Sequence, residues 1–96
     1  MSKYKLILEL KPDLSADKQG GVMGRVKSLV TDAGGKVSEA KSGGLVKLAY
    51  PIDGSTEANL FTIPFDASRE AVDSLQRGMR KLGGVLRAMI VRGERG

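Results

Sequence analysis

The sequence of 96 residues contains no cysteine and no histidine. These absences exclude disulfide frameworks, thiolate nucleophiles and metal sites built on Cys or His ligands. They also remove the usual general base of acid–base and nucleophilic catalysis. The remaining Lys, Asp, Glu, Ser and Tyr residues form no pattern that indicates a catalytic centre. We therefore predict a protein that is not an enzyme and that uses no cofactor, no metal and no small-molecule substrate.

Aromatic residues and long apolar runs are also scarce. Aromatics make up 4% of the chain, so the core must consist mainly of Leu, Val, Ile and Ala. The apolar and charged fractions, 41% and 28%, are typical of a soluble globular domain. No apolar run reaches the roughly 18 residues that span a bilayer, and the start of the chain has no signal-peptide pattern. We expect one domain, residues 1–96, in the cytoplasm and without a membrane partner.

Acidic residues are almost missing from the last part of the chain. Residues 1–76 hold ten Lys or Arg and ten Asp or Glu, so their charges cancel. The whole net charge of +5 therefore comes from residues 77–96. Their charged residues are Arg77, Arg80, Lys81, Arg87, Arg92 and Arg95, with Glu94 as the one acid. Such a cluster is expected of a protein that binds a phosphate-rich partner, although a solubilising surface explains it equally well.

Hydrophobic periodicity predicts six elements in the order strand, helix, strand, strand, helix, strand. Alternation over residues 4–10 places Tyr4 and three leucines on one face of the first strand. A helix at 16–33, capped by Ser15, follows, and then a strand from 36 to 52 that bends at Gly43–Gly44. A turn at 53–57 leads to a strand at 60–65, with Pro64 at its end or at a bulge. The last two elements are a second helix capped by Ser68 and a strand at 85–92. Gly20, Gly21 and Gly24 predict a weak first half of the first helix.

This element order predicts an α+β fold. Right-handed crossovers place both helices on the same side of the sheet, which gives a two-layer sandwich. The simplest matching topology is the ferredoxin-like βαββαβ arrangement. We expect a four-stranded antiparallel sheet in the spatial order 4-1-3-2, with two helices on one face.

The second face of such a sheet has no helix to cover it. Alternation places on it the residues Lys5, Ile7, Glu9, Leu45, Lys47, Ala49, Leu60, Thr62, Arg87, Met89 and Val91. An exposed surface that mixes apolar and basic groups is typical of a docking site, whereas the alternative is a sheet that merely tolerates apolar residues. We predict that Ile7, Leu45, Met89 and Val91 dock a partner.

Two nucleic-acid motifs are weakly supported. The stretch 21–24, Gly-Val-Met-Gly, matches the GXXG form of KH domains, but its middle pair is apolar and the element order differs. The element order fits an RNA recognition motif, but the outward positions of the first and third strands lack the aromatic residues on which bases stack. Tyr50 is predicted to pack in the inner layer with Val46, Leu48 and Ile52.

One family resemblance covers nearly the whole chain. Residues 47–52, Lys-Leu-Ala-Tyr-Pro-Ile, resemble the signature of the bacterial small-subunit ribosomal protein six family. Residues 85–92 resemble its last strand, and Tyr4, residues 12–15, 65–68 and 70–72 also fit. The resemblance implies the ferredoxin-like fold and a structural component of the small ribosomal subunit. It further implies binding to the central domain of the subunit's RNA together with small-subunit ribosomal protein eighteen.

The residues expected to contact RNA are basic. They are Lys3, Lys47, Arg87 and Arg92, followed by Arg77, Arg80 and Lys81. Arg87 and Arg92 match the family's pattern, and a guanidinium group suits bidentate contact with phosphate. The trio at 77–81 lies in the last turns of the second helix, where cations also interact favourably with the helix dipole. The alternative function is a stand-alone ferredoxin-like regulatory module that binds a small ligand or self-associates through its open sheet.

Overall fold

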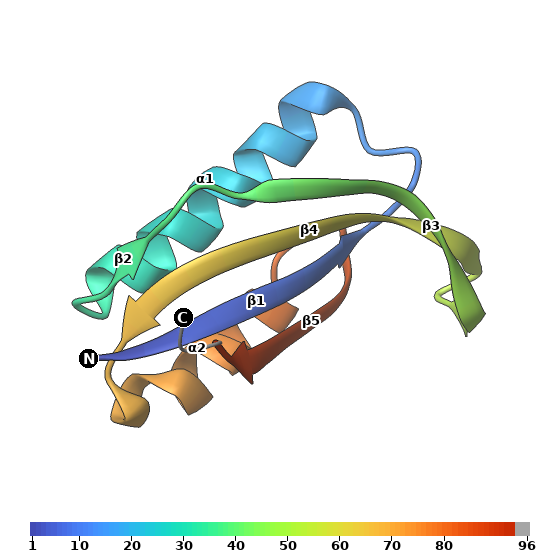
Figure 1. Ribbon diagram of the computed structural model, residues 1–96. Coiled ribbons are helices and arrows are strands. Elements are labelled where there is room, and N and C mark those ends of the chain that lie inside the picture. Colours follow the sequence, from blue (N-terminus) through green and yellow to red (C-terminus); the bar gives the residue numbers. More distant parts are fainter. Residues whose placement is uncertain (94–96) are drawn as a thin grey trace.

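The computed structural model describes residues 1–93 of the chain (Figure 1). Arg95, part of the predicted basic cluster, lies outside this part. The elements are β1 (Ser2–Leu10), α1 (Ala16–Asp32), β2 (Lys36–Val37), β3 (Lys41–Ile52), β4 (Ser55–Ala67), the 3₁₀ turn η1 (Arg69–Ala71), α2 (Val72–Arg80) and β5 (Val85–Arg92). No helix within residues 1–93 is long and apolar enough to cross a membrane.

The strands form one antiparallel sheet. β4 pairs with β1, β1 pairs with β5, and β2 and β3 both pair with β4. β2 and β3 are two parts of the predicted second strand, so the predicted spatial order is confirmed. Both helices lie on one face of the sheet, as the topology requires, and the face toward the viewer in Figure 1 has no helix over it. The two-layer α+β prediction is therefore correct.

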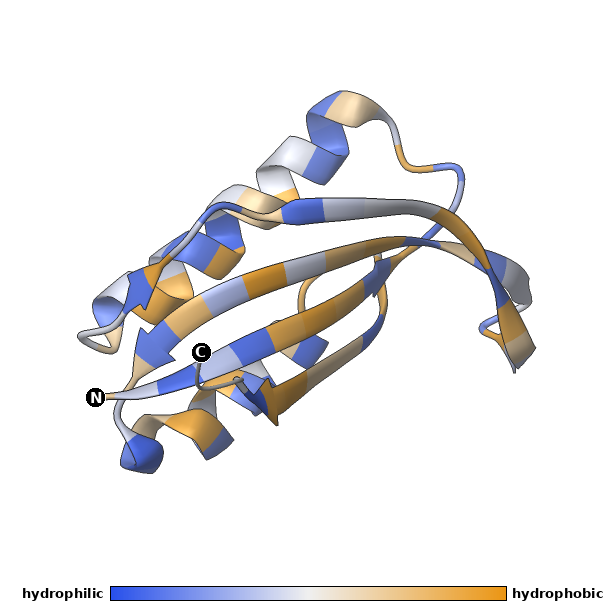
Figure 2. Cartoon of the chain, in the orientation of Figure 1, coloured by the Kyte–Doolittle hydropathy of each residue, from blue (hydrophilic) through white to orange (hydrophobic). Residues whose placement is uncertain are grey.

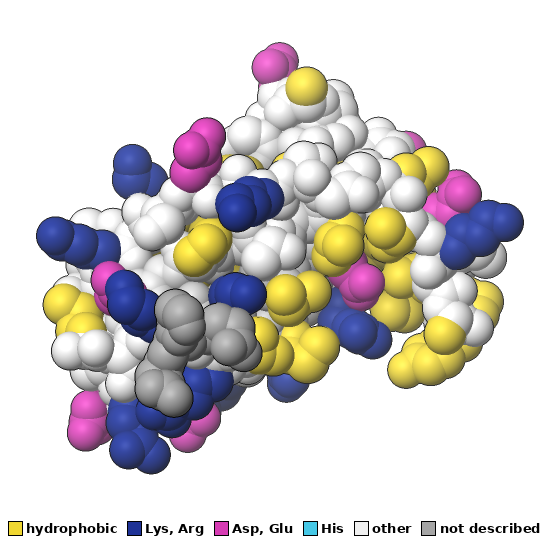
Figure 3. All heavy atoms as spheres, viewed as in Figure 1, with side chains coloured by type: hydrophobic (Ala, Val, Ile, Leu, Met, Phe, Trp, Pro, Cys, Tyr) yellow, Lys and Arg dark blue, Asp and Glu magenta, His cyan; other side chains and the backbone are white. Residues whose placement is uncertain are grey.

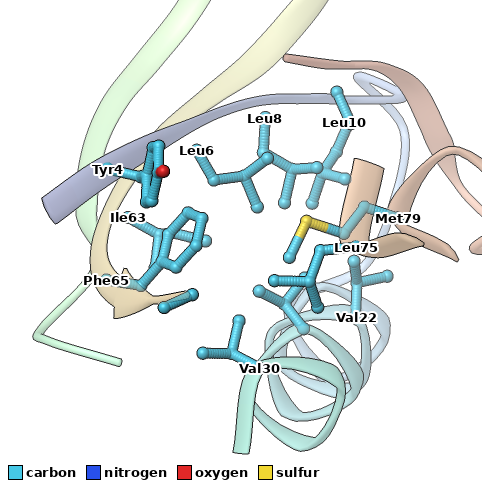
Figure 4. Packing of buried hydrophobic residues seen from close by; sticks show 13 residues of the cluster. Tyr4, Leu6, Leu8, Leu10, Val22, Val30, Ile63, Phe65, Leu75 and Met79 are labelled. Carbon is cyan, nitrogen blue, oxygen red and sulfur yellow. The ribbon is translucent and has the colours of Figure 1, made fainter. Parts of the chain in front are cut away.

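The core lies between the sheet and the helices. The even residues of β1, Tyr4, Leu6, Leu8 and Leu10, are buried as predicted. They meet apolar side chains that share the helix-facing side of each element: Val22, Val26, Val30, Ile63, Phe65, Leu75 and Met79 (Figure 4). The rings of Tyr4 and Phe65 stack with centroids 5.6 Å apart. Figure 2 shows hydrophobic stretches along β1, β4 and β5, with hydrophilic residues between them.

The helix α1 begins and continues as its sequence predicts. The Ser15 side chain accepts a hydrogen bond from the backbone N–H of Lys18 at 3.3 Å, which is an N-cap contact. The three glycines of its first half are exposed, and a Cβ at any of them would meet nothing within 4 Å. The helix remains continuous because Val22, Val26 and Val30 on its inner side are buried in the core.

Pro64 explains why the second predicted strand is divided. It lies inside β4 opposite Lys5, not at the end of the strand. Its carbonyl accepts a hydrogen bond from Ser38 N–H at 2.8 Å. In an antiparallel strand the N and C=O of one residue point to the same neighbour, so the missing N–H of Pro64 faces the break between β2 and β3.

The β3–β4 hairpin is longer than predicted. The turn contains only Asp53 and Gly54, with φ values of 49° and 80°, and not the whole stretch 53–57. This is the left-handed pair of a type I′ hairpin turn, for which Asp-Gly is a favoured sequence. β4 pairs with β1 only from Asn59 onward, so the hairpin tip extends beyond the rest of the sheet (Figure 1).

The start of the second helix also differs from the prediction. Ser68 is followed by η1, and its side chain makes no capping hydrogen bond. α2 begins only at Val72 and ends at Arg80. Its inner side, Leu75 and Met79, is buried as predicted, and Leu82 packs against the core from the loop that follows.

Candidate RNA and partner interface

The open face of the sheet is defined by the pairing of its strands. Directly opposed residues in antiparallel strands point to the same face. Ile7 of β1 lies between Thr62 of β4 and Met89 of β5, and Lys5 lies between Pro64 and Val91. Hydrophobic side chains gather over the middle of this face and toward the hairpin in Figure 3, with charged groups among and around them. The structure therefore brings together three of the four predicted docking residues, Ile7, Met89 and Val91.

Leu45 does not belong to this face, so its predicted placement is wrong. A β-bulge shifts the register between Ser42 and Gly44, and an extra residue in one strand reverses the alternation that follows. Leu45 is consequently opposite Asn59, whose amide donates to Lys11 O on the helix side. Val46, opposite Ala58, takes its place on the open face.

Two further residues of the hairpin also differ from their predicted positions, and a second register shift lies between Lys47 and Ile52. Lys47 lies opposite Glu57 and on the side of Leu45, away from the open face. Tyr50 was expected to pack in the inner layer, but it is 64% exposed. Leu45 is 56% exposed, so the protruding hairpin carries two large apolar side chains that this chain does not cover.

Glu9 is the unusual residue of the open face. It is a charged residue with 9% exposure on the open face, opposite Leu60 on one side and Arg87 on the other. Arg87 Nε lies 3.3 Å from Glu9 Oε1 as an ion pair. Oε1 is buried, and no described group makes a hydrogen bond of good geometry with it. Arg87, predicted to contact RNA, is thus partly occupied with this carboxylate.

A second ion pair lies at the other end of the same face. Lys3 Nζ is 3.8 Å from Asp66 Oδ1, and the two side chains are 72% and 39% exposed. Arg92 lies at the same end of the sheet as Lys3, but on its other side. It is opposite Tyr4, whose side chain belongs to the core face. The predicted cations Lys3 and Arg92 therefore lie on opposite sides of the sheet.

The cations of the second helix form a separate group. Arg77 and Arg80 belong to α2, and Lys81 follows at its C-cap. The neighbouring Gln76 donates from Nε2 to Ala88 O and accepts from Ile90 N–H at 2.9 Å, so it holds α2 against the outer edge of β5. This side-chain contact also occupies backbone groups of an edge strand that would otherwise be free to pair with another strand.

Arg80 and Arg87 are the predicted cations that the fold brings to one groove. A groove of about 440 Å³ is lined by Arg80, Val85, Leu86, Arg87, Ala88 and Met89. It continues the open face around the edge of β5, since Arg87 and Met89 belong to both. The seven predicted RNA-contact residues do not form one patch: they are divided among the open face, the hairpin, the helix layer and, for Arg92, the opposite side of the sheet.

Comparison with known proteins identifies the family. The family model described as ribosomal protein S6 matches residues 3–92. The chain belongs to the ribosomal protein S6 family.

Its relatives cover almost its whole length. It is 34% identical to small ribosomal subunit protein bS6 of Caldanaerobacter subterraneus over 92 residues, which are 96% of this chain and 97% of that protein. It is 33% identical over 92 residues to bS6 of Thermoanaerobacter pseudethanolicus, again covering 96% and 97%. The crystal structure of ribosomal protein S6 from Thermotoga maritima superposes with a TM-score of 0.84 at 20% identity, covering 96% of this chain and 87% of that one. That likeness confirms the ferredoxin-like fold.

Membership of the S6 family confirms the broad prediction from the sequence. The protein is a non-enzymatic, structural component of the small ribosomal subunit, and its location is the ribosome, a cytoplasmic particle. The stand-alone regulatory module is thereby the weaker interpretation.

Within this S6-family fold, sequence reasoning missed two residues. Glu9 was placed on the open face without its burial or its ion pair. Gln76 was not singled out at all, because nothing in its local sequence distinguishes it from a solvent-exposed helix residue. The sequence does carry a signal for Glu9. It shares the outward face of its strand with Ile7, so its carboxylate lies among apolar neighbours that exclude water.

Proposed function

We propose that this protein binds the central domain of small-subunit ribosomal RNA jointly with small-subunit ribosomal protein eighteen, and that its open sheet face docks that protein. The observation that carries the proposal is the contrast between the two kinds of surface. Apolar side chains are concentrated on the open face, around Ile7 and Met89, whereas the cations are dispersed. A concentrated apolar surface suits protein docking, and dispersed cations suit scattered phosphate contacts.

The protein alone is expected to bind RNA weakly. Arg87 and Lys3 each have a carboxylate neighbour within 4 Å, so each contributes less free charge to a phosphate contact. A few phosphate contacts give an affinity that falls steeply with salt and carries little sequence information. Among residues 1–93, the opposed pairs of the open face include no aromatic residue, so bases have no platform on which to stack. Docked protein eighteen adds buried apolar area and fixes the geometry of the phosphate contacts.

The hairpin is the second place at which we expect RNA contact. Tyr50 is exposed on the protruding tip, and Lys47 lies on the same strand. An exposed tyrosine can stack on an unpaired base while a cation of the same strand contacts the backbone. Tyr50→Ala should weaken the RNA affinity of the protein pair while leaving the affinity between the two proteins unchanged.

The test is a titration of the RNA domain at physiological salt with this protein, with protein eighteen, and with both. We expect tight binding only for the pair. Ile7→Asp and Met89→Asp should abolish the cooperative gain, while Ser28→Asp, on the exposed side of α1, should leave it intact. Circular dichroism and thermal unfolding report whether each variant is folded. Tight, sequence-specific binding by the unaltered protein alone would refute the joint mechanism.

A further inference from the structure

We propose that Glu9 is the specificity-determining residue of the open face, and that it accepts a hydrogen bond from an arginine or lysine side chain of the docked protein. This inference rests on the proposed docking function and names the chemistry that the partner must bring. The partner surface is predicted to be a largely apolar strip with one guanidinium or ammonium group near its centre.

The first support is the state of the Glu9 carboxylate. Its side chain is 12% exposed, and in the described part of the chain no other charged residue is buried. A buried carboxylate is stable only when its oxygens are paired and hydrogen-bonded. Arg87 Nε supplies an ion pair at 3.3 Å, but Oε1 has no hydrogen-bond donor of good geometry among residues 1–93. Because Oε1 itself is buried beside Arg87, an incoming donor approaches the part of the carboxylate that remains exposed, its other oxygen Oε2.

The second support is the apolar ring around the carboxylate. Leu60 lies directly opposite Glu9 on β4, and Ile7 and Met89 form the adjacent opposed pair on the same face. The Leu60 side chain extends over Gly43, where a Cβ would approach it to 2.9 Å. A partner that covers these side chains removes the remaining water from Glu9. An unpaired oxygen would then become costly, so a partner without a donor is rejected.

The chemistry favours a protein donor over the other possible occupants. RNA would bring phosphates toward a carboxylate, which is repulsive. A second copy of this chain would bring its own Lys5 and Arg87 against the cations of this face, which outnumber its two carboxylates, Glu9 and Asp66. A protein partner that supplies one cation within an apolar surround pairs with the Glu9 carboxylate and adds a single positive charge to the face.

The experiment measures the affinity of purified protein eighteen for this protein by calorimetry. Glu9→Gln keeps the size of the side chain but removes its charge, and Glu9→Met removes the acceptor as well. We expect Glu9→Gln to weaken binding roughly tenfold and Glu9→Met more strongly, the range of a hydrogen bond to a charged group. Asp66→Asn is the matched control, because it removes the carboxylate of the more exposed ion pair near the end of the same face. It should leave the affinity unchanged.

A double-mutant cycle then identifies the donor. Each Arg and Lys of protein eighteen is replaced by Ala in turn, and we expect one of these changes to lose most of its effect when Glu9 is Gln. Thermal unfolding of each Glu9 variant separates lost contact from lost folding.

Each outcome has a defined meaning. Equal or tighter binding by Glu9→Met overturns this inference while leaving the proposed docking in place. Dimerisation of this protein that Glu9→Met abolishes in sedimentation identifies a second copy as the occupant and also overturns it. Failure of the unaltered protein to bind protein eighteen overturns the proposed function, and this inference with it.

Discussion

The two faces of β1 differ in what covers them and in what they contain. The even residues, from Tyr4 to Leu10, lie under the helices and are buried and apolar. The odd residues face away from the helices, and among them Ile7 is only partly buried while Glu9 is buried by its neighbours and a single cation. The two faces of one strand thus have different roles. The helix-covered face supplies the buried apolar side chains of the core, and the open face is the one that we propose to dock a second molecule.

The largest expected effect on the free energy of unfolding comes from replacing one residue on the covered face of β1, compared with one on its open face. Leu8→Ala removes a fully buried side chain from the core and should lower the free energy of unfolding by about 2–5 kcal/mol. Ile7→Ala on the open face should cost about 1 kcal/mol, because the side chain is only partly buried. Denaturant unfolding followed by circular dichroism measures both.

The affinity for protein eighteen should show the opposite order. Ile7→Ala should weaken it, while Leu8→Ala, studied at a temperature at which the variant is still folded, should leave it nearly unchanged. Similar stability losses from the two variants would contradict the division between the faces.

The sequence predicts the covered face much better than the open one. The apolar alternation in β1, the apolar side of each helix and the glycines that end the helices determine which side chains are buried. These patterns repeat over short stretches of sequence, so they can be recognised locally. The order of the strands then follows from the crossovers. These features specify the core from Tyr4 to Leu10 and its helix partners without knowledge of the register.

The open face depends on the register, which local patterns do not specify. One bulged residue at Gly43 moves Leu45 and Lys47 to the opposite side of the hairpin and brings Val46 onto the open face. The ion pair of Glu9 needs a contact between residues 78 positions apart in the sequence. The short Asp53–Gly54 turn is different: its dipeptide signal is present in the sequence, and the predicted turn was simply too long.

The two ion pairs of the open face provide a smaller and sharper test. Arg87→Ala leaves the buried Glu9 carboxylate without its ion pair and should lower the free energy of unfolding by about 1–2 kcal/mol. Lys3→Ala should change it by no more than about 0.5 kcal/mol, because that pair is exposed and screened.

Adding Glu9→Met to Arg87→Ala should recover most of the lost stability, since it removes the uncompensated charge. Chemical denaturation by urea, which adds no salt, is the suitable measurement. Additive losses in the double variant would show that the two side chains act independently.

A small effect of the opposite sign is expected outside both faces, on the exposed side of α1. Gly24→Ala adds a methyl group into open space on a helix whose backbone is already helical there. It should raise the free energy of unfolding by about 0.5–1 kcal/mol, because alanine loses less backbone entropy than glycine when the helix forms. Gly35→Ala is the matched control, and it should be destabilising because its Cβ would collide with the backbone oxygen of Asp66.

Amide exchange should show the glycine-rich first half of α1 as its least protected part, and protection there should rise in the Gly24→Ala variant. Affinity for protein eighteen should stay the same, since stability gained in the helix layer leaves the open face unaltered. A loss of stability in Gly24→Ala, or uniform protection along α1, would contradict this account.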